Sequence, residues 1–327
     1  MPSFRSHIYA LVLSNWHRTA FTSAAGLHRW IRWARQRQTY RPPAELTSRV
    51  SISAGTTNGF PVYEVRPRQV TSRLHLFYLH GGAFVFEITR YHWDLIAELS
   101  ERLGAVVTVP IYPLAPEHRF DAIFGMAMAV YRGLLDQVQA SDIVFVGDSA
   151  GGNMALVMTM MAAEQGLPTP AAHVLISPGV DVSLTNPEVL EYAKVDPWLA
   201  IPGGIEAVGL YAPRFERTDW RVSPIFGDLA VLPPMLLLTG TRDLLHPDSV
   251  MFAEKARAAG VDVELVVEKG MMHVWPLLVT REARRARERI IAFLREVESG
   301  YAASAAARSG MSDGIASASA QSMSPEP

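Results

Sequence analysis

IVFVGDSAGGNM, residues 143–154, is the stretch of sequence that decides the fold. Its four leading apolar residues predict a short buried strand, and a G-x-S-x-G pentapeptide centred on Ser149 follows directly. Residues 153–158 then begin a helix-forming run. A serine on so sharp a strand-to-helix turn has a strained backbone, and glycines two residues to either side avoid collisions. Standing alone, the pentapeptide would fit a glycine-rich turn with an incidental serine equally well.

Strands and helices alternate on both sides of this stretch. Further strands are predicted at residues 50–52, 60–65, 74–79, 105–109, 172–177, 235–239 and 263–267. Helices are predicted at residues 93–103, 123–135, 153–165, 249–259 and 281–297. This alternation predicts an α/β fold whose mostly parallel central sheet is covered by helices on both faces.

Three parts of the chain have different composition. Residues 1–45 carry aromatic and basic residues at roughly helical spacing and predict a helical cap segment. Such a helix could lie on a membrane surface, but we expect it to cover a pocket of its own protein. Residues 46–299 form the main α/β domain, in which residues 178–230 lack a strand pattern and are interpreted as a cap insertion. The Ala/Ser-rich residues 300–327 predict a disordered tail.

Composition excludes several classes of protein. The 327 residues carry a net charge of −2, so no basic field would attract nucleic acid. There is no cysteine, which rules out disulfides and thiolate metal sites and favours a cytoplasmic location. No apolar run approaches the ~20 residues needed to cross a bilayer, so we expect no stable membrane insertion. The apolar run at residues 8–13 is too short for a signal peptide and lacks a cleavage pattern.

A serine hydroxyl becomes a nucleophile only when a histidine takes its proton, and an acid must fix the tautomer of that histidine. In an α/β-hydrolase arrangement the order along the chain is serine, acid, histidine, each at the end of a strand. Asp243 follows the strand at residues 235–239, and His273 follows the strand at 263–267. We therefore predict a catalytic triad of Ser149, Asp243 and His273.

Other candidates for the acid and the base are weaker. His246 and Asp248 begin the helix after Asp243, where Asp248 could cap it. His80 belongs to a glycine-rich loop, and Asp148 is expected to support the turn next to it. Asp262 precedes its strand and would therefore lie at the wrong end of the sheet.

The sequence HGGAF at residues 80–84 predicts an oxyanion hole. Fixed amide donors stabilise the negative oxygen of a tetrahedral intermediate, and losing one typically costs about 2.7–4 kcal/mol. A loop of this type after an early strand supplies such donors, together with the amide that follows the serine. We assign the donors as the N–H groups of Gly82, Ala83 and Ala150, with Gly81 allowing the loop conformation.

These motifs together resemble those of the hormone-sensitive-lipase family of α/β-hydrolases, the bacterial carboxylesterases marked by HGGG and GDSAGG. The resemblance covers residues 74–278 and rests on HGGAF at 80–84, YPLAPEH at 112–118, GDSAGGN at 147–153 and the loops of Asp243 and His273. It implies the same triad, an N-terminal helical cap over the pocket, and hydrolysis of short- to medium-chain acyl esters. It also implies a homodimer formed through an edge strand. Ala83 in place of the third glycine and Trp275 after the histidine depart from the family pattern.

The expected partner is a small-molecule ester, and no metal or other cofactor is implied because Ser149 needs no activator beyond His273. Lactone or amide hydrolysis by the same triad stays open, and a non-catalytic receptor on the same fold is disfavoured because the histidine is present. Large side chains that could line the pocket, or equally pack in the core, are Phe84, Tyr91, Trp93, Trp198, Leu199, Tyr211 and Trp275.

Overall fold

The computed structural model describes residues 2–15 and 17–320. Its centre is an eight-stranded sheet in the order β1-β2-β4-β3-β5-β6-β7-β8. The strands are β1 (Ser51–Thr57), β2 (Phe60–Arg66), β3 (His75–Leu79), β4 (Val106–Pro110), β5 (Ile143–Asp148), β6 (Ala172–Ile176), β7 (Met235–Arg242) and β8 (Val263–Met272). Only β1 and β2 pair antiparallel with their neighbours, and the remaining pairs are parallel. The predicted α/β fold class is therefore confirmed.

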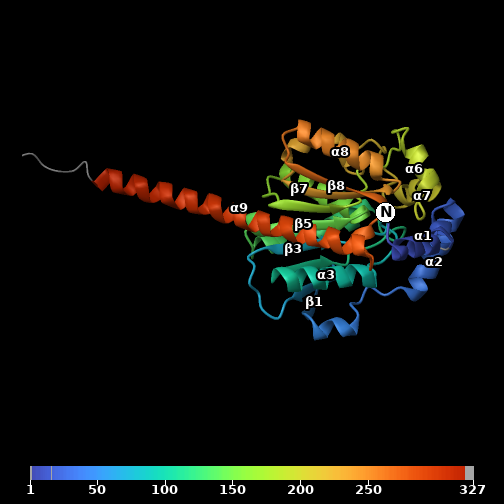
Figure 1. Ribbon diagram of the computed structural model, residues 1–327, viewed down its shortest axis with the longest axis horizontal. Coiled ribbons are helices and arrows are strands. Elements are labelled where there is room, and N and C mark those ends of the chain that lie inside the picture. Colours follow the sequence, from blue (N-terminus) through green and yellow to red (C-terminus); the bar gives the residue numbers. More distant parts are fainter. Residues whose placement is uncertain (1, 16, 321–327) are drawn as a thin grey trace, which may run out of the picture.

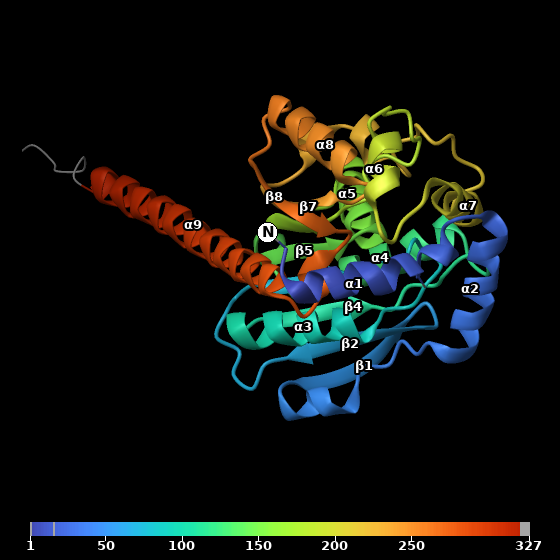
Figure 2. The same cartoon turned by 45° about the vertical axis from the view of Figure 1, so that its right-hand side comes forward.

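Helices cover both faces of this sheet (Figures 1 and 2). They are α1 (Phe4–Asn15), α2 (Ala24–Arg37), α3 (Arg90–Leu103), α4 (Phe120–Leu135), α5 (Ala150–Glu164), α6 (Val189–Val195), α7 (Ile201–Tyr211), α8 (His246–Ala258) and α9 (Arg281–Ala320). Short 3₁₀ turns are η1 (His17–Ala20), η2 (Ala44–Ser48), η3 (Ala140–Asp142), η4 (Pro224–Phe226), η5 (Leu229–Val231) and η6 (Trp275–Leu277). Among the described residues, none of these helices is both long enough and apolar enough to cross a bilayer.

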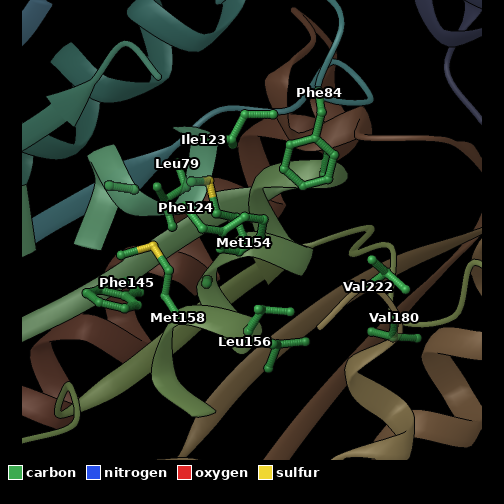
Figure 3. Packing of buried hydrophobic residues seen from close by; sticks show 14 of the residues in the cluster. Leu79, Phe84, Ile123, Phe124, Phe145, Met154, Leu156, Met158, Val180 and Val222 are labelled. Atoms are coloured by element: carbon green, nitrogen blue, oxygen red, sulfur yellow. The ribbon is translucent and has the colours of Figure 1, made fainter. Parts of the chain in front are cut away.

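The apolar core forms two clusters, one on each face of the sheet. β5 shows why: Phe145 belongs to one cluster and Val144 and Val146 to the other, as the alternation of a strand requires. Figure 3 draws the first cluster, in which Met154 and Met158 of α5 pack with Phe124 and Phe145. The helix after Ser149 is thus buried almost all round, which fixes the strand-to-helix turn rigidly between core layers.

The N-terminal segment lies against the helices of residues 178–230. Arg18 of η1 donates hydrogen bonds to the backbone carbonyls of Asp196 and, at 2.8 Å, Ala193, at the end of α6. The Gly203 N–H of α7 donates to the Phe21 carbonyl at 2.8 Å, and His28 of α2 pairs with Glu206 at 2.7 Å. The two segments interpreted as cap from the sequence are therefore in direct contact with each other.

The end of the chain differs from the sequence prediction. Residues 300–320, expected to be disordered, continue α9, which projects away from the sheet (Figure 1). Alanine has the highest helix propensity, so an Ala-rich stretch can prolong a packed helix without an apolar face of its own. The remainder of the predicted tail, residues 321–327, lies outside the described residues.

Candidate active site

Ser149 sits at the sharp turn between β5 and α5. Its backbone has φ 53° and ψ −117°, a conformation that residues other than glycine rarely adopt. Gly151 permits the turn because a Cβ there would lie 1.9 Å from the Leu79 carbonyl oxygen of the adjacent strand β3. The G-x-S-x-G pattern therefore reflects a close approach between the turn and β3, and the half-buried serine is held beyond the end of β5.

The side chains predicted as a triad converge on one point. His273 Nε2 lies 2.9 Å from Ser149 Oγ, where it can accept the hydroxyl proton. His273 Nδ1 lies 3.1 Å from each carboxylate oxygen of Asp243, which fixes the ring with Nδ1–H as donor. Asp243 also accepts the Leu245 N–H at 2.9 Å, and no part of the Asp243 residue is exposed to solvent. Serine, histidine and carboxylate are thus linked in the order that proton transfer from Ser149 requires.

The pKa of His273 is the balance of opposing effects. Burial acts to lower it, but the negative charge and hydrogen bond of Asp243 outweigh burial, so the pKa is raised above its ordinary value of 6.5. Asp196 and Asp148 raise it further. His273 must be neutral to accept a proton, so activity through this base should fall as the pH drops through that raised pKa.

Backbone amides without an acceptor in the described part of the chain lie in the loop after β3 and at the start of α5. Gly82, Ala83 and Phe84 have positive φ values of 118°, 54° and 59°, a conformation that is strained for Ala83 and Phe84 but not for the glycine. Among the described residues, no hydrogen bond is found from the N–H of Gly82 or of Ala83. Ala150 opens α5, so its N–H has no intrahelical acceptor. These are the donors that the sequence predicts for an oxyanion hole.

Asp148 lies beneath this loop. A Cβ on Gly81 would lie 2.2 Å from Asp148 Oδ2, so only glycine fits over the carboxylate. Tyr78 donates its hydroxyl to Asp148 Oδ1 at 3.0 Å, and His92 Nε2 lies 3.2 Å from Oδ2. Burial opposes ionisation of Asp148, but His92 and these hydrogen bonds prevail and lower its pKa. The ionised carboxylate therefore links the residue before Ser149 to β3 and α3, and among the described residues it makes no hydrogen bond with His273.

The competing residues have other partners. His246 lies 3.2 Å from Thr239 Oγ1 through its Nδ1, and Asp248 accepts the Asn186 side-chain amide at 2.8 Å. His80 stacks on Tyr112, with 4.2 Å between the ring centroids. Asp262 precedes β8, so it lies at the opposite end of that strand from His273. None of the four makes a hydrogen bond with Ser149 or His273 among the described residues.

The structure divides the predicted pocket residues. The Trp198 ring centroid lies 5.7 Å from that of His273, and half-buried Leu199 follows it. Phe84 and Tyr211 stack on each other at 4.2 Å, next to the glycine loop. Trp198 and Leu199, from the 178–230 insertion, are half-buried and form the pocket wall, whereas Phe84 and Tyr211 are almost completely buried and pack beneath the glycine loop.

The other three predicted pocket residues lie elsewhere, which corrects that part of the interpretation. Trp93 is buried on the opposite face of the sheet, where it packs edge-on against Tyr63 of β2 at 5.4 Å. Trp275 is fully buried in the same cluster and offers no surface to a substrate. Tyr91 is 42% exposed and interacts with Tyr9 of α1. Apolar composition alone does not separate core from pocket, because both use the same residue types.

Asp196 is the residue of this site that the sequence did not identify. One of its carboxylate oxygens accepts the N–H groups of Trp198 and Leu199, at 2.6 and 2.8 Å, and the other accepts that of Leu244 at 2.7 Å. Burial, and then the charge of Asp243, raise its pKa. Asp196 thus ties the pocket wall to the residue that follows the triad acid. The only signal in the sequence was the Asp-Pro-Trp-Leu stretch at residues 196–199.

We expect Asp196→Asn to lower kcat about tenfold, because the amide cannot accept all three N–H groups and one buried donor loses its partner. The acidic limb of the pH profile of kcat/KM should move to lower pH, since the Asp196 charge raises the pKa of His273. Rates measured from pH 5 to 9 test both effects. Asp248→Asn, a change at a buried carboxylate without contact to the triad, is the matched control and should leave the limb in place. If the acidic limb of the Asp196 variant does not move, Asp196 only supports the loop and does not influence the pKa of His273.

In the described part of the chain, no group of three or more His, Cys, Asp or Glu side chains is arranged to hold a metal ion. The chemistry available from the residues present is acyl transfer by a hydroxyl nucleophile, a base and amide donors.

Comparisons with known proteins agree with this geometry. The family model described as alpha/beta hydrolase fold matches residues 76–277. An esterase of Acinetobacter venetianus is 34% identical over 210 residues, covering 64% of this chain and 69% of the relative. The carboxylesterase NlhH of Mycobacterium tuberculosis is 31% identical over 294 residues, covering 84% of this chain and 91% of the relative. The crystal structure of an esterase from the bacterial hormone-sensitive lipase family superposes with a TM-score of 0.77 at 28% identity, covering 90% and 99% of the two chains.

Proposed function

Because this chain belongs to the hormone-sensitive-lipase family of α/β-hydrolases and is a carboxylic ester hydrolase, we propose that it is a serine carboxylesterase acting through Ser149, His273 and Asp243. The proposed substrates are small esters with short- to medium-chain acyl groups. The observation that carries the proposal is the 2.9 Å distance from His273 Nε2 to Ser149 Oγ, with Asp243 on the other ring nitrogen.

The first half of the reaction forms an acyl-enzyme. Ser149 Oγ attacks the ester carbonyl carbon while His273 Nε2 takes the hydroxyl proton, and Asp243 stabilises the imidazolium that results. The carbonyl oxygen becomes negative and is stabilised by the N–H groups of Gly82, Ala83 and Ala150. The imidazolium then gives its proton to the departing alcohol, the carbon–oxygen bond to the alcohol breaks, and the acyl group stays on Ser149.

The second half repeats these steps with water. His273, neutral again, takes a proton from a water molecule that attacks the acyl carbon. The new tetrahedral oxygen uses the same amide donors, and His273 returns the proton to Ser149 Oγ as the acid leaves. Each residue therefore acts twice in the cycle.

The packing beside the glycine loop supports a preference for small acyl groups. Phe84 and Tyr211 are almost completely buried and stacked, so little room is open beside the glycine loop. The methyl group of Ala83 leaves less room for a substrate at the glycine loop than a glycine at this position would.

A panel of p-nitrophenyl esters from acetate to palmitate tests the proposal. We expect kcat/KM to be highest for acyl chains of about two to eight carbons and to fall by more than about tenfold for palmitate, because a long chain has no open room beside Phe84 and Tyr211. Lactones and anilides of the same acyl groups, assayed in parallel, should react more slowly. A faster reaction with either of these would make lactone or amide hydrolysis the principal activity.

A further inference from the structure

The outward face of α1 is apolar. Phe4, Ile8, Leu11 and Val12 are 80%, 46%, 63% and 51% exposed. Their spacing of four, seven and eight residues from Phe4 places all four on one side of the helix. Surface apolar residues are normally scattered singly, so four large ones grouped on three turns of helix indicate a binding surface.

The inward face of the same helix is less apolar than the outward face. Its buried residues are Ser6, Ala10 and Leu13. Ser6 donates its hydroxyl to Glu282 at the start of α9 at 3.0 Å, and Ser3, just before the helix, does so at 2.8 Å. Hydrogen bonds to the body of the protein thus hold α1 so that Phe4, Ile8 and Leu11 point away from it. Packing within the chain leaves this face unpartnered among the described residues.

The segment that carries this face is strongly basic. Residues 1–44 contain seven arginines and no aspartate or glutamate, whereas the whole chain has a net charge of −2. Two of these arginines bind within the protein: Arg18 donates to the end of α6, and Arg35 pairs with Glu117 at 3.0 Å. The other five, Arg5, Arg29, Arg32, Arg37 and Arg41, are exposed. On α2, Trp33 is 41% exposed with the Arg37 guanidinium 5.6 Å from its ring centroid.

We propose that α1 docks this protein onto the surface of an anionic lipid bilayer, with Phe4, Ile8, Leu11 and Val12 entering the interface. A helix with large apolar residues on one side, in a segment rich in arginine and aromatic residues, lies in the plane of such an interface and is attracted by anionic headgroups. Twelve residues of helix span only about 18 Å, so α1 lies on the bilayer and does not cross it.

The charge distribution favours a bilayer over a second copy of the chain. A symmetric pair joined through α1 would place the same patch of both subunits face to face, and with it two copies of the arginine-rich segment. An anionic bilayer instead supplies opposite charge. α1 begins beside the start of α9 and runs toward α2, away from the projecting part of α9 (Figures 1 and 2).

Flotation of the full-length protein with vesicles tests the proposal. We expect binding to vesicles of phosphatidylcholine with one third phosphatidylglycerol, and at least about tenfold weaker binding to phosphatidylcholine alone or in high salt. The triple variant F4S/I8S/L11S should lose at least about tenfold in partition onto the anionic vesicles. The matched control V70S/V267S alters exposed valines that are not part of α1 and should bind as the wild type does. Unchanged melting temperature and unchanged hydrolysis of p-nitrophenyl acetate show that the variants are folded.

Three results would overturn the docking proposal. One is absence of wild-type binding to the anionic vesicles, and another is equal binding by F4S/I8S/L11S. The third is a triple variant that converts a dimer into a monomer in light scattering while its vesicle binding is unchanged, which would make this face a subunit interface. Because hydrolysis of the soluble ester is measured separately, failure of membrane docking would leave the proposed esterase function untouched.

Discussion

Replacing Ser149 with alanine should abolish hydrolysis of p-nitrophenyl butyrate, with kcat reduced by a factor on the order of 10⁵–10⁶. The variant loses the only atom that would bond to the acyl carbon, while His273, Asp243 and the amide donors stay in place. Alanine keeps the backbone turn and removes one half-buried oxygen, so we expect a melting temperature within a few degrees of the wild type.

Ser53→Ala is the matched control for this loss. It removes a hydroxyl from the exposed edge strand β1, far along the sheet order from β5, and should keep wild-type turnover. If the Ser149 variant instead hydrolyses the ester at the wild-type rate while the assay blank stays low, another group is the nucleophile and the reaction scheme above is wrong.

Replacing Asp243 with asparagine should lower kcat by about 10⁴. Asparagine has nearly the same shape, but its amide group can donate to the ring and stabilise the wrong tautomer of His273. It also removes the charge that outweighs burial and raises the pKa of the imidazole. Steady-state rates over pH 5 to 9 should show the loss at every pH, with KM changed much less than kcat because the carboxylate does not line the pocket.

The control for Asp243 is Asp262→Asn. Asp262 is exposed and precedes β8, at the opposite end of that strand from His273. The substitution makes the same chemical change away from the triad, so we expect no effect on turnover. If the rate of Asp243→Asn stays within tenfold of the wild type, another carboxylate is the acid. Asp196 would then be the first candidate, because it accepts the N–H of Leu244 in the loop that carries Asp243.

The inner parallel strands could be predicted because they are buried on both faces and appear as continuous apolar runs. β3 and β5 are buried at every residue, and the structure contains strands at all the predicted places. Helix starts were predicted about three residues late at α3, α4, α5 and α8. At α5 the first turn contains Gly151, Gly152 and Asn153, which have low helix propensity, and tertiary packing of the serine turn overrides that propensity.

The features that escaped prediction depend on contacts between distant segments. Asp196 matters because its carboxylate meets the N–H of Leu244, a contact between the insertion and the loop after β7. Trp93 and Trp275 lie on the opposite side of the sheet from Phe84, and the sequence around each residue does not indicate on which side it lies. α1 exposes large apolar side chains and buries Ser6 with Ala10 and Leu13, so its pattern departs from the usual signal for a helix that packs on a core.

The central claim is that Ser149 carries the acyl group between the two halves of the reaction, and mass spectrometry of the trapped intermediate tests it most directly. Protein mixed with excess p-nitrophenyl butyrate, quenched in acid within milliseconds and digested, should show one butyryl group per chain, on the peptide that contains Ser149, and none in the Ser149→Ala variant. A butyryl group on a different residue, or full turnover in the first cycle with no acylated peptide at any quench time, would contradict the account.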